Sequence, residues 1–253
     1  MNVETEAIIL RQTKTLGGRT MITMFTERYG KIGAGTSISE KSRSRSALAL
    51  RPFCHGRYQL YKSRDSYSVT GAEVIESFYS LGEDVDKYLA ASYALELTDA
   101  MLGEDVPQAV IYRLLKEFLG MMEKRKSSYD TLVIAYQLKA LDVLGSGPQL
   151  KSCMRCGRVL EPLPKDEELR FSVEDGGLIC AQCLSERDSL DPLIFDVDAD
   201  IIQILSYMRD HSLSSLSGLA VPEASAARIR RILSAYISHH LGISNLKSEG
   251  FKI

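Results

Sequence analysis

The sequence lacks any apolar run that approaches the length of a membrane-spanning helix. Its first ten residues, MNVETEAIIL, also lack the basic region and long apolar core of an export signal. We therefore expect a cytoplasmic protein without a membrane span, in a compartment that disfavours disulfides. Internal repeats and low-complexity tracts are absent as well. The 253 residues have the composition of an ordinary globular protein with room for more than one core.

The motifs that mark common enzymes are also missing. The chain has no G-x4-G-K-[ST] phosphate loop and no G-x-S-x-G nucleophile turn. The segment DVDAD, residues 196–200, resembles the start of a calcium loop, but Ile201 and Tyr207 occupy the positions that require a glycine and an acid. We interpret these acids as residues at the start of a helix. Cys54 and His55 are neighbours on an expected strand and face opposite ways, so we expect no catalytic pair there and a buried or edge Cys54.

Cysteine is scarce but strongly patterned. Of five cysteines, four form two C-x2-C pairs: Cys153, Cys156, Cys180 and Cys183. This spacing lets each pair direct two sulfurs at one ion. The 23 residues between the pairs include LRFSVEDGGLIC, which predicts two short strands joined at Asp175-Gly176-Gly177, a hairpin that would bring the second pair beside the first. We expect Gly157 to leave space for backbone N–H groups to approach the thiolates.

These four cysteines predict a metal site. We expect one structural zinc ion per chain, because four thiolates leave no coordination position open for a substrate. Rubredoxin-like iron is the alternative metal. The alternatives without metal are two disulfides, which a reducing cytoplasm disfavours, and four buried thiols.

Positive charge is concentrated near the N-terminus, although the whole chain has a formal net charge of −2. Residues 1–65 hold 12 Lys and Arg against 5 Asp and Glu, a net +7, while the rest hold 19 against 28, a net −9. Basic residues interleaved with aromatic ones suit nucleic acid, because charges follow phosphates while rings stack on unpaired bases. The candidates for DNA contact are Arg11, Lys14, Arg19, Arg28, Tyr29, Lys31, Lys41, Arg43, Arg45, Arg51 and Tyr61. The alternative for each is a solvated charge or a ring that belongs to the protein's own packing.

Hydrophobic periodicity divides the chain into β and α regions. Partial alternation predicts strands at 3–12, 19–27, 30–38, 54–63 and 66–76, which suit a small barrel or sandwich. Helical spacing predicts helices near 83–102, 110–122, 132–145, 198–209 and 222–241. The expected fold class is α+β and multidomain. Its parts are a β-domain at 1–80, a helical domain at 81–149 and 186–253, and a four-cysteine module at 150–185 inserted in the helical domain.

The last expected helix, 222–241, has an apolar face with arginines beside it. By default such a face belongs to the core. The alternative is that its edge receives an acidic, apolar peptide from a partner protein. The residues of that candidate site are Arg228, Arg231 and Tyr236.

Together these features resemble the bacterial recombination mediator family RecO. The residues that carry the resemblance are AIILRQTKTLGGRTMITMFTERYGKI, KSRSRSALALRPF, YQLKALDVLGSGPQLKSCMRCGRVL and FSVEDGGLICAQC. The resemblance covers nearly the whole chain and implies an N-terminal five-stranded OB-fold barrel, then a helical domain with an inserted four-cysteine zinc ribbon. It also implies DNA contact through the basic N-terminal module, most directly Lys41, Arg43 and Arg45, and metal ligation by the four paired cysteines.

The resemblance further implies a non-enzymatic role in DNA repair. Members of the family bind single- and double-stranded DNA, anneal complementary strands, and act with RecR to help RecA replace the single-stranded-DNA-binding protein. The acidic tail of that protein is the peptide expected at Arg231, and the expected location is the cytoplasm, in association with the nucleoid. Two alternatives stay open: a zinc-ribbon adaptor that acts through protein–protein contacts, as in transcription-associated modules, and a metal-dependent nuclease, which a closed metal site disfavours.

Overall fold

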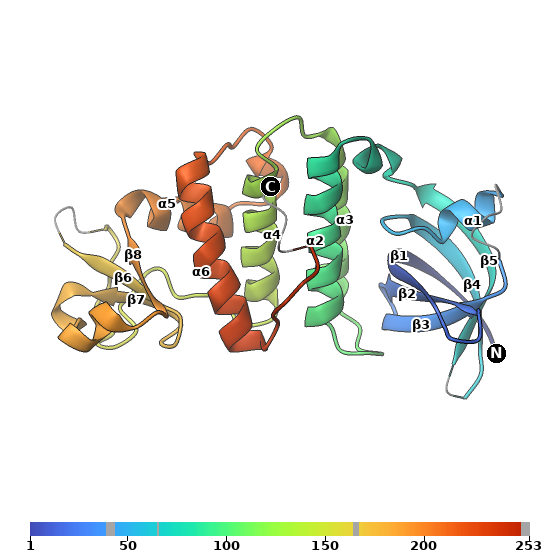
Figure 1. Ribbon diagram of the computed structural model, residues 1–253, viewed down its shortest axis with the longest axis horizontal. Helices are drawn as coiled ribbons and strands as arrows, with labels where there is room; N and C mark the ends of the chain where they lie inside the picture. Colours follow the sequence, from blue (N-terminus) through green and yellow to red (C-terminus); the bar gives the residue numbers. More distant parts are fainter. Residues whose placement is uncertain (39–43, 65, 164–166, 249–253) are drawn as a thin grey trace. The chain divides into compact units, whose positions relative to one another are not determined.

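The computed structural model describes residues 1–38, 44–64, 66–163 and 167–248 (Figure 1). The chain forms two compact units: one comprises Met1–Arg125 and the segment that begins at Leu246, and the other comprises Lys126–Asn245. The expected α+β class, with a five-stranded sheet first and helices after it, is confirmed. The domain boundaries expected from the sequence stay a prediction. In the structure, the two helices that follow the sheet belong to the same unit as the sheet.

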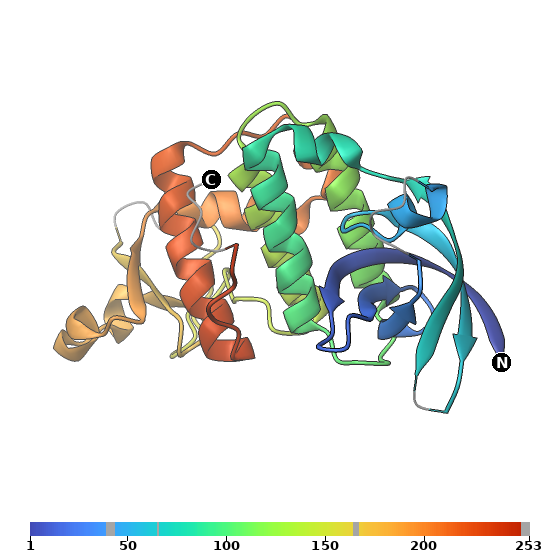
Figure 2. The ribbon, with the colours of Figure 1, turned by 45° about the vertical axis from the view of Figure 1, so that its right-hand side comes forward.

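Five strands of the first unit close into a barrel in the order β1-β2-β3-β5-β4. They are β1 (Asn2–Lys14), β2 (Thr20–Thr26), β3 (Gly30–Thr36), β4 (His55–Lys62) and β5 (Tyr67–Glu76). Neighbouring strands are antiparallel, except that β3 and β5 pair in parallel over a short stretch. The long β4–β5 hairpin projects from the barrel (Figure 2). Each strand begins and ends within two residues of its expected position, so partial alternation between turn sequences located the sheet.

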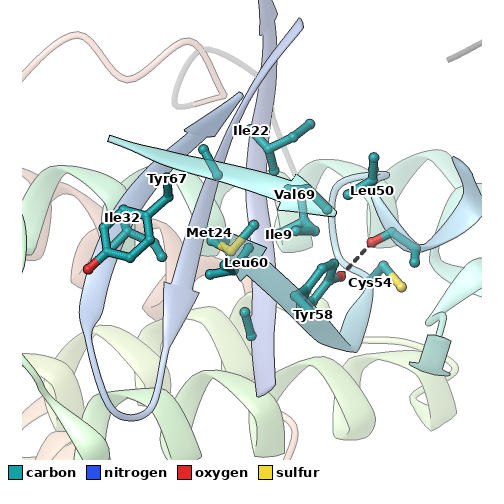
Figure 3. Packing of buried hydrophobic residues seen from close by; sticks show 13 residues of the cluster. Ile9, Ile22, Met24, Ile32, Leu50, Cys54, Tyr58, Leu60, Tyr67 and Val69 are labelled. Carbon is teal, nitrogen blue, oxygen red and sulfur yellow. Dashed lines mark hydrogen bonds between the residues drawn. The ribbon is translucent and has the colours of Figure 1, made fainter. Parts of the chain in front are cut away.

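Alternating apolar side chains fill the barrel (Figure 3). The labelled members of this cluster are Ile9, Ile22, Met24, Ile32, Leu50, Cys54, Tyr58, Leu60, Tyr67 and Val69. Tyr58 carries the one dashed contact in Figure 3: its hydroxyl donates to the backbone oxygen of Ala49 at 2.5 Å. Ala49 ends the short helix α1 (Arg45–Ala49), which the periodicity did not predict. This hydrogen bond therefore ties α1 to the barrel core.

Two helices complete the first unit: α2 (Val85–Met101) and α3 (Ala109–Lys124). The single-turn helix η1 (Tyr79–Glu83) leads from β5 to α2. The loop between α2 and α3 passes so close to β3 that a Cβ atom at Gly30 would lie 2.2 Å from the carbonyl oxygen of Val106. Beside it, the backbone N–H of Asp105 donates to the carbonyl of Lys31 at 3.0 Å. Gly30 is thus required by the close approach of two backbone segments.

The helices of the second unit are α4 (Tyr129–Val143), α5 (Ala199–Asp210) and α6 (Glu223–Leu241). Helix α4 is buried along most of its length and packs against both α5 and α6. The single-turn helix η4 (Ser214–Leu216) lies between α5 and α6. Asp198 caps α5, because its carboxylate accepts from the backbone N–H of Ile201 at 2.9 Å. The interpretation of DVDAD as the start of a helix is confirmed.

A small antiparallel sheet follows α4, with strand order β7-β6-β8. Its strands are β6 (Leu169–Ser172), β7 (Gly177–Cys180) and β8 (Ile194–Val197), and the single-turn helices η2 (Ala181–Cys183) and η3 (Glu186–Leu190) connect β7 to β8. The expected hairpin is β6–β7. Strand β8 was not expected, and it extends this sheet past residue 185. Phe171 of β6 packs edge to face on Tyr236 of α6, with ring centroids 5.9 Å apart, so the sheet is joined to the helices of its unit.

Candidate metal centre and nucleic-acid surface

The four paired cysteines converge on one point in the second unit. Their sulfur atoms all lie within 4.8 Å of one another, and Sγ of Cys156 is 3.8 Å from Sγ of Cys180. Four sulfurs at the usual 2.3 Å from a tetrahedral metal are separated by about 3.8 Å. The cluster therefore has the donor set and the spacing to hold one metal ion.

The backbone around the first pair forms a tight turn. The N–H of Cys153 donates to the carbonyl of Arg158 at 2.8 Å, and the N–H of Gly157 donates to the carbonyl of Cys153 at 2.9 Å. Gly157 has φ +74°, in the left-handed region, while a Cβ atom there would meet nothing within 4 Å. The expectation that Gly157 leaves space is therefore wrong. The turn needs glycine for its backbone conformation.

The β6–β7 hairpin delivers the second pair, as expected. Cys180 is the last residue of β7, and Cys183 ends η2, one turn later. At the tip of the hairpin, Gly176 has φ +85°, and a Cβ atom on Gly177 would lie 2.3 Å from the carbonyl oxygen of Gln149. Gly176 is thus needed for the turn conformation, and Gly177 for the close approach of the hairpin to the chain that leads into the first pair.

Backbone donors surround the sulfur of Cys153. The N–H of Cys180 lies 3.4 Å from this sulfur. Burial raises the pKa of the Cys153 thiol. Hydrogen bonds from the backbone N–H groups of Cys180, Cys156 and Arg155 lower it by more, so that the pKa falls from its ordinary value of 9.0 to about 6. Because the thiolate is the form that binds metal, these N–H groups favour Cys153 as a ligand at neutral pH. Burial and hydrogen bonds among the thiols raise the pKa of Cys180, and the same kind of hydrogen bonds, then burial, raise the pKa of Cys183.

Arg155 joins the two halves of the cluster, and the sequence did not indicate it. Its guanidinium donates to the carbonyl of Cys183 at 3.0 Å, to Asp188 at 2.8 and 2.9 Å, and to Asp175 at 3.1 and 3.2 Å. Hydrogen bonds from Arg155, then from the N–H of Ser185, hold the pKa of Asp188 well below its usual range. The only hint in the sequence was a basic residue inside the first C-x2-C.

A second ion pair also links the two cysteine pairs. Arg158 contacts the carboxylate of Glu167, whose other oxygen accepts from the backbone N–H of Ala181 at 3.2 Å. Ala181 directly follows Cys180. This pair therefore connects the turn of the first cysteine pair to the backbone of the second.

Two of the basic residues predicted to contact DNA are engaged inside the first unit. Arg11 of β1 and Lys31 of β3 both pair with Asp99 of α2, at 2.8 and 3.1 Å. The ammonium group of Lys31 also donates to the backbone oxygen of Asp99 at 2.5 Å, and its side chain is only 13 % exposed. These contacts fasten α2 to the barrel.

Lys14 and Arg19 lie together at the β1–β2 turn. They line a hollow of about 550 Å³ with the backbone of Gly17, Gly18, Gly35 and Thr36. A Cβ atom at Gly35 would lie 3.0 Å from the guanidinium of Arg19, so this glycine lets the arginine lie across β3.

The remaining candidates in the barrel are dispersed. Arg28 lines a hollow with three acids, Glu4, Glu6 and Glu27, and with Arg57, which pairs with Glu4 and Glu6. The ring of Tyr29 is half-buried against the barrel core, with its centroid 6.5 Å from that of Tyr67. Tyr61 of β4 is 50 % exposed. Lys41 and Arg43 lie outside the described residues, whereas Arg45 and Arg51 line a larger groove beside α1.

The candidate peptide site on α6 is mostly core. Tyr236 is 3 % exposed, together with Ile229, Ile232, Leu233 and Ile237. Arg228 pairs with Asp198 at 2.5 Å and donates to the carbonyl of Asp196 at 3.0 Å. Arg228 and Arg231 line a hollow of about 310 Å³ with Ile194 and Phe195 of β8.

Comparison with known proteins covers both units. Residues 1–78 match the sequence model of the family described as "Recombination protein O N terminal", and residues 82–250 match "Recombination protein O C terminal". The chain belongs to the RecO family. It is 29 % identical to the DNA repair protein RecO of Alkaliphilus metalliredigens, with 98 % of this chain and 97 % of that protein aligned.

Other RecO proteins match over a similar length. The DNA repair protein RecO of Bacillus pumilus is 28 % identical over 99 % of this chain and 93 % of its own length. That of Desulforudis audaxviator is 30 % identical over 94 % of this chain and 91 % of its own length. The barrel lies within the N-terminal RecO match and the four cysteines within the C-terminal one. In the part of the chain that the structure describes, no helix has the length and apolar character needed to cross a membrane.

Proposed function

We propose that this chain acts in DNA repair as a non-enzymatic recombination mediator that binds DNA and passes it between partner proteins. The observation that carries the proposal is the RecO match over both halves of the chain, with relatives named DNA repair protein RecO aligned over more than nine-tenths of their length. Following the family resemblance, the protein binds single- and double-stranded DNA, anneals complementary strands and, with RecR, helps RecA displace the single-stranded-DNA-binding protein.

The barrel supports a nucleic-acid role. Its closed ring of five strands, β1-β2-β3-β5-β4, suits the five-stranded OB-fold that the family resemblance implies. OB-folds bind oligonucleotides on the face of strands 2 and 3 and on the loops after strands 1 and 4. The hollow at Lys14 and Arg19 lies on the first of these loops and reaches the end of β3. We therefore assign phosphate contact first to Lys14 and Arg19.

The other residues expected to contact DNA are weaker candidates for that contact. Arg11 and Lys31 are paired with Asp99, and Arg28 lies in a hollow where three acids outnumber two arginines. Tyr61 is exposed and can stack on a base, whereas the half-buried Tyr29 supports the barrel core. Lys41 and Arg43 stay in the proposal on the resemblance alone, whereas Arg45 also lines the groove beside α1.

We assign zinc to the cysteine cluster as a structural ion. Cys153, Cys156, Cys180 and Cys183 would hold it, and four thiolates suit zinc better than a hard cation. When bound, the ion supplies a cross-link between the two cysteine pairs. Arg155 and Arg158 connect the same two segments from outside the sulfur cluster.

The peptide partner is assigned to the edge of α6. Since Tyr236 is core, the exposed part of this site reduces to Arg231 and the small hollow that it shares with Arg228 and β8. The proposed ligand is the acidic tail of the single-stranded-DNA-binding protein. Replacing Arg231 with Glu should weaken binding of that tail peptide, and unchanged binding in a folded variant would remove Arg231 from the site.

DNA binding by the full chain tests the proposal. Affinity for single strands should fall as salt rises, because each phosphate contact releases counterions. The variant Lys14→Ala, Arg19→Ala should lower affinity for every sequence alike and flatten the slope of log affinity against log salt by about 1.4, from about 0.7 per contact. The matched control is Arg57→Ala, since Arg57 pairs with Glu4 and Glu6. A wild-type protein that binds no DNA at low salt would refute the proposed function.

A further inference from the structure

A groove of about 1260 Å³ lies in the first unit, between α1, β5 and the start of α2. We name it the α1 groove. Its buried lining is apolar and includes Phe53, Cys54 and Phe78, each at most 8 % exposed. Its outer lining is apolar as well as accessible: Leu48 is 41 % exposed, Tyr88 47 % and Tyr79 69 %. Tyrosine and leucine side chains left this open to water at one place are a common mark of a binding surface.

The charge of the α1 groove is positive. Arg45 and Arg51 line it, and neither guanidinium has an ion pair with any of the described residues. Glu73 is the one acid among the described residues of the lining. Two other arginines of the same unit do have carboxylate partners: Arg11 pairs with Asp99, and Arg57 with Glu4 and Glu6. The two arginines of the groove are therefore available to an anionic ligand.

The aromatic rings of the groove are held in place by the fold. Phe53 packs edge to face on Tyr88, with ring centroids 5.5 Å apart. Phe53 has φ +73° and Phe78 has φ +46°, in the left-handed region that large side chains rarely adopt. Phe53 is kept there because its N–H donates to the carbonyl of Ile9 at 3.1 Å, where β1 shifts register. Unfavourable backbone conformations at two lining residues are typical of a functional site.

We propose that the α1 groove binds a segment of single-stranded DNA, with an unpaired base on the ring of Tyr79 and phosphates at Arg45 and Arg51. The inference rests on the proposed function and adds a binding position distinct from the hollow at Lys14 and Arg19. A duplex keeps its bases stacked on one another and cannot offer a base face to a tyrosine. The groove therefore selects single strands, whereas the Lys14 hollow, which offers charge and backbone, accepts both forms.

An acidic peptide would also satisfy the two arginines, but the aromatic geometry favours DNA. A peptide anchor needs an enclosed pocket for its apolar side chain, whereas Tyr79 presents more than two-thirds of its surface to solvent. Exposed rings beside unpaired arginines suit a planar base joined to a phosphate.

Fluorescence anisotropy with labelled oligothymidine and with a labelled duplex of equal length tests the proposal on the full chain. Tyr79→Ala should weaken oligothymidine binding about tenfold and leave duplex binding unchanged, because only stacking is lost. Tyr79→Phe keeps the ring and should bind like the wild type. Arg51→Ala should flatten the salt slope for oligothymidine by about 0.7. The matched controls are Tyr207→Ala, at a 44 % exposed tyrosine of α5, and Arg57→Ala. Neither should change the affinity for oligothymidine or for the duplex.

These measurements distinguish failure of the groove proposal from failure of the proposed function. If the wild type binds oligothymidine and a folded Tyr79→Ala variant binds it equally well, the groove proposal is wrong while DNA binding stands. Equal loss for oligothymidine and duplex would overturn the selectivity for single strands. Unchanged DNA binding combined with lost binding of a labelled acidic, apolar peptide would make the groove a peptide site. A wild-type protein that binds neither oligothymidine nor the duplex would refute the proposed function itself.

Discussion

The guanidinium of Arg155 donates to both carboxylate oxygens of Asp188, at 2.8 and 2.9 Å. Arg155 lies between the two cysteines of the first pair, and Asp188 lies beyond the second pair in η3. The same guanidinium donates to the carbonyl of Cys183. The two segments that would hold a metal are thus joined by a charge-assisted, two-pronged contact, which is among the stronger polar contacts in proteins.

Arg155→Gln should loosen the metal site without removing a ligand. Contacts around the ligands of a metal typically account for about 10- to 100-fold in affinity. We expect zinc to be transferred to a chromogenic chelator at least about tenfold more readily than from the wild type. The matched control is Arg170→Gln, because Arg170 pairs with Glu168 and Asp196 on the same small sheet. Equal zinc transfer from Arg155→Gln and the wild type would show that the contact does not support the site.

Removing a ligand should have a larger effect than removing Arg155. Cys180→Ser takes one thiolate from a group that, among the described residues, contains four cysteines and no His, Asp or Glu, so the β6–β7 hairpin should lose order while the barrel keeps its structure. Metal analysis of the reduced wild type should find about one zinc per chain. Cys54→Ala should retain that zinc. Wild-type protein purified under reducing conditions without metal would contradict the assignment.

The buried Cys54 predicts a loss of stability at high pH. Burial raises the pKa of its thiol to about 11, from an ordinary value near 9, although a hydrogen bond with Tyr58 acts the other way. The folded state therefore keeps its proton at pH values where the unfolded chain loses it. This contribution to the free energy of unfolding is complete below about pH 9 and is lost as the pH rises toward 11. Denaturant titrations should show a steeper decline over this range for the wild type than for Cys54→Ala. Parallel curves would show that Cys54 does not titrate in this way.

Tyr58→Phe should destabilise the barrel through α1. The change removes the 2.5 Å hydrogen bond to Ala49 and leaves a buried carbonyl without its donor. The cost should be about 1–3 kcal/mol of unfolding free energy. Tyr61→Phe is the control on the same strand, because Tyr61 is half exposed. Chemical denaturation measures both variants, and equal stability of Tyr58→Phe and the wild type would mean that α1 is held by other contacts.

Local patterns in the sequence predicted most of the fold. Alternation located the five barrel strands, helical spacing located α2 to α6, and the glycine turn located the β6–β7 hairpin. Strand β8 was not predicted, because its four residues carry no pattern of their own and form a strand only by pairing with β6. Helix α1, with five residues, is likewise too short for periodicity to reveal.

The metal site could be predicted from the sequence, whereas the ion pairs and the groove could not, because only the cysteine spacing is a local pattern. The spacing of the cysteines is local, so the cluster of four sulfurs could be foreseen. Counting basic residues could not show that Asp99, 88 residues after Arg11, takes up Arg11 and Lys31. Nor could it show that Arg155 reaches Asp188, or that Tyr79 and Tyr88 stand beside Arg45 and Arg51 in one groove. Ion pairs and grooves depend on distant segments meeting, which only the folded chain determines.

The central claim is that this protein handles DNA as a recombination mediator, and strand annealing tests it most directly. Two complementary oligonucleotides, one labelled with a donor and the other with an acceptor fluorophore, are mixed naked or coated with single-stranded-DNA-binding protein. We expect the wild type to accelerate annealing of both, and the variant Lys14→Ala, Arg19→Ala to accelerate it less. Annealing that proceeds at the uncatalysed rate on naked and coated strands alike, with folded and zinc-loaded protein, would contradict the account.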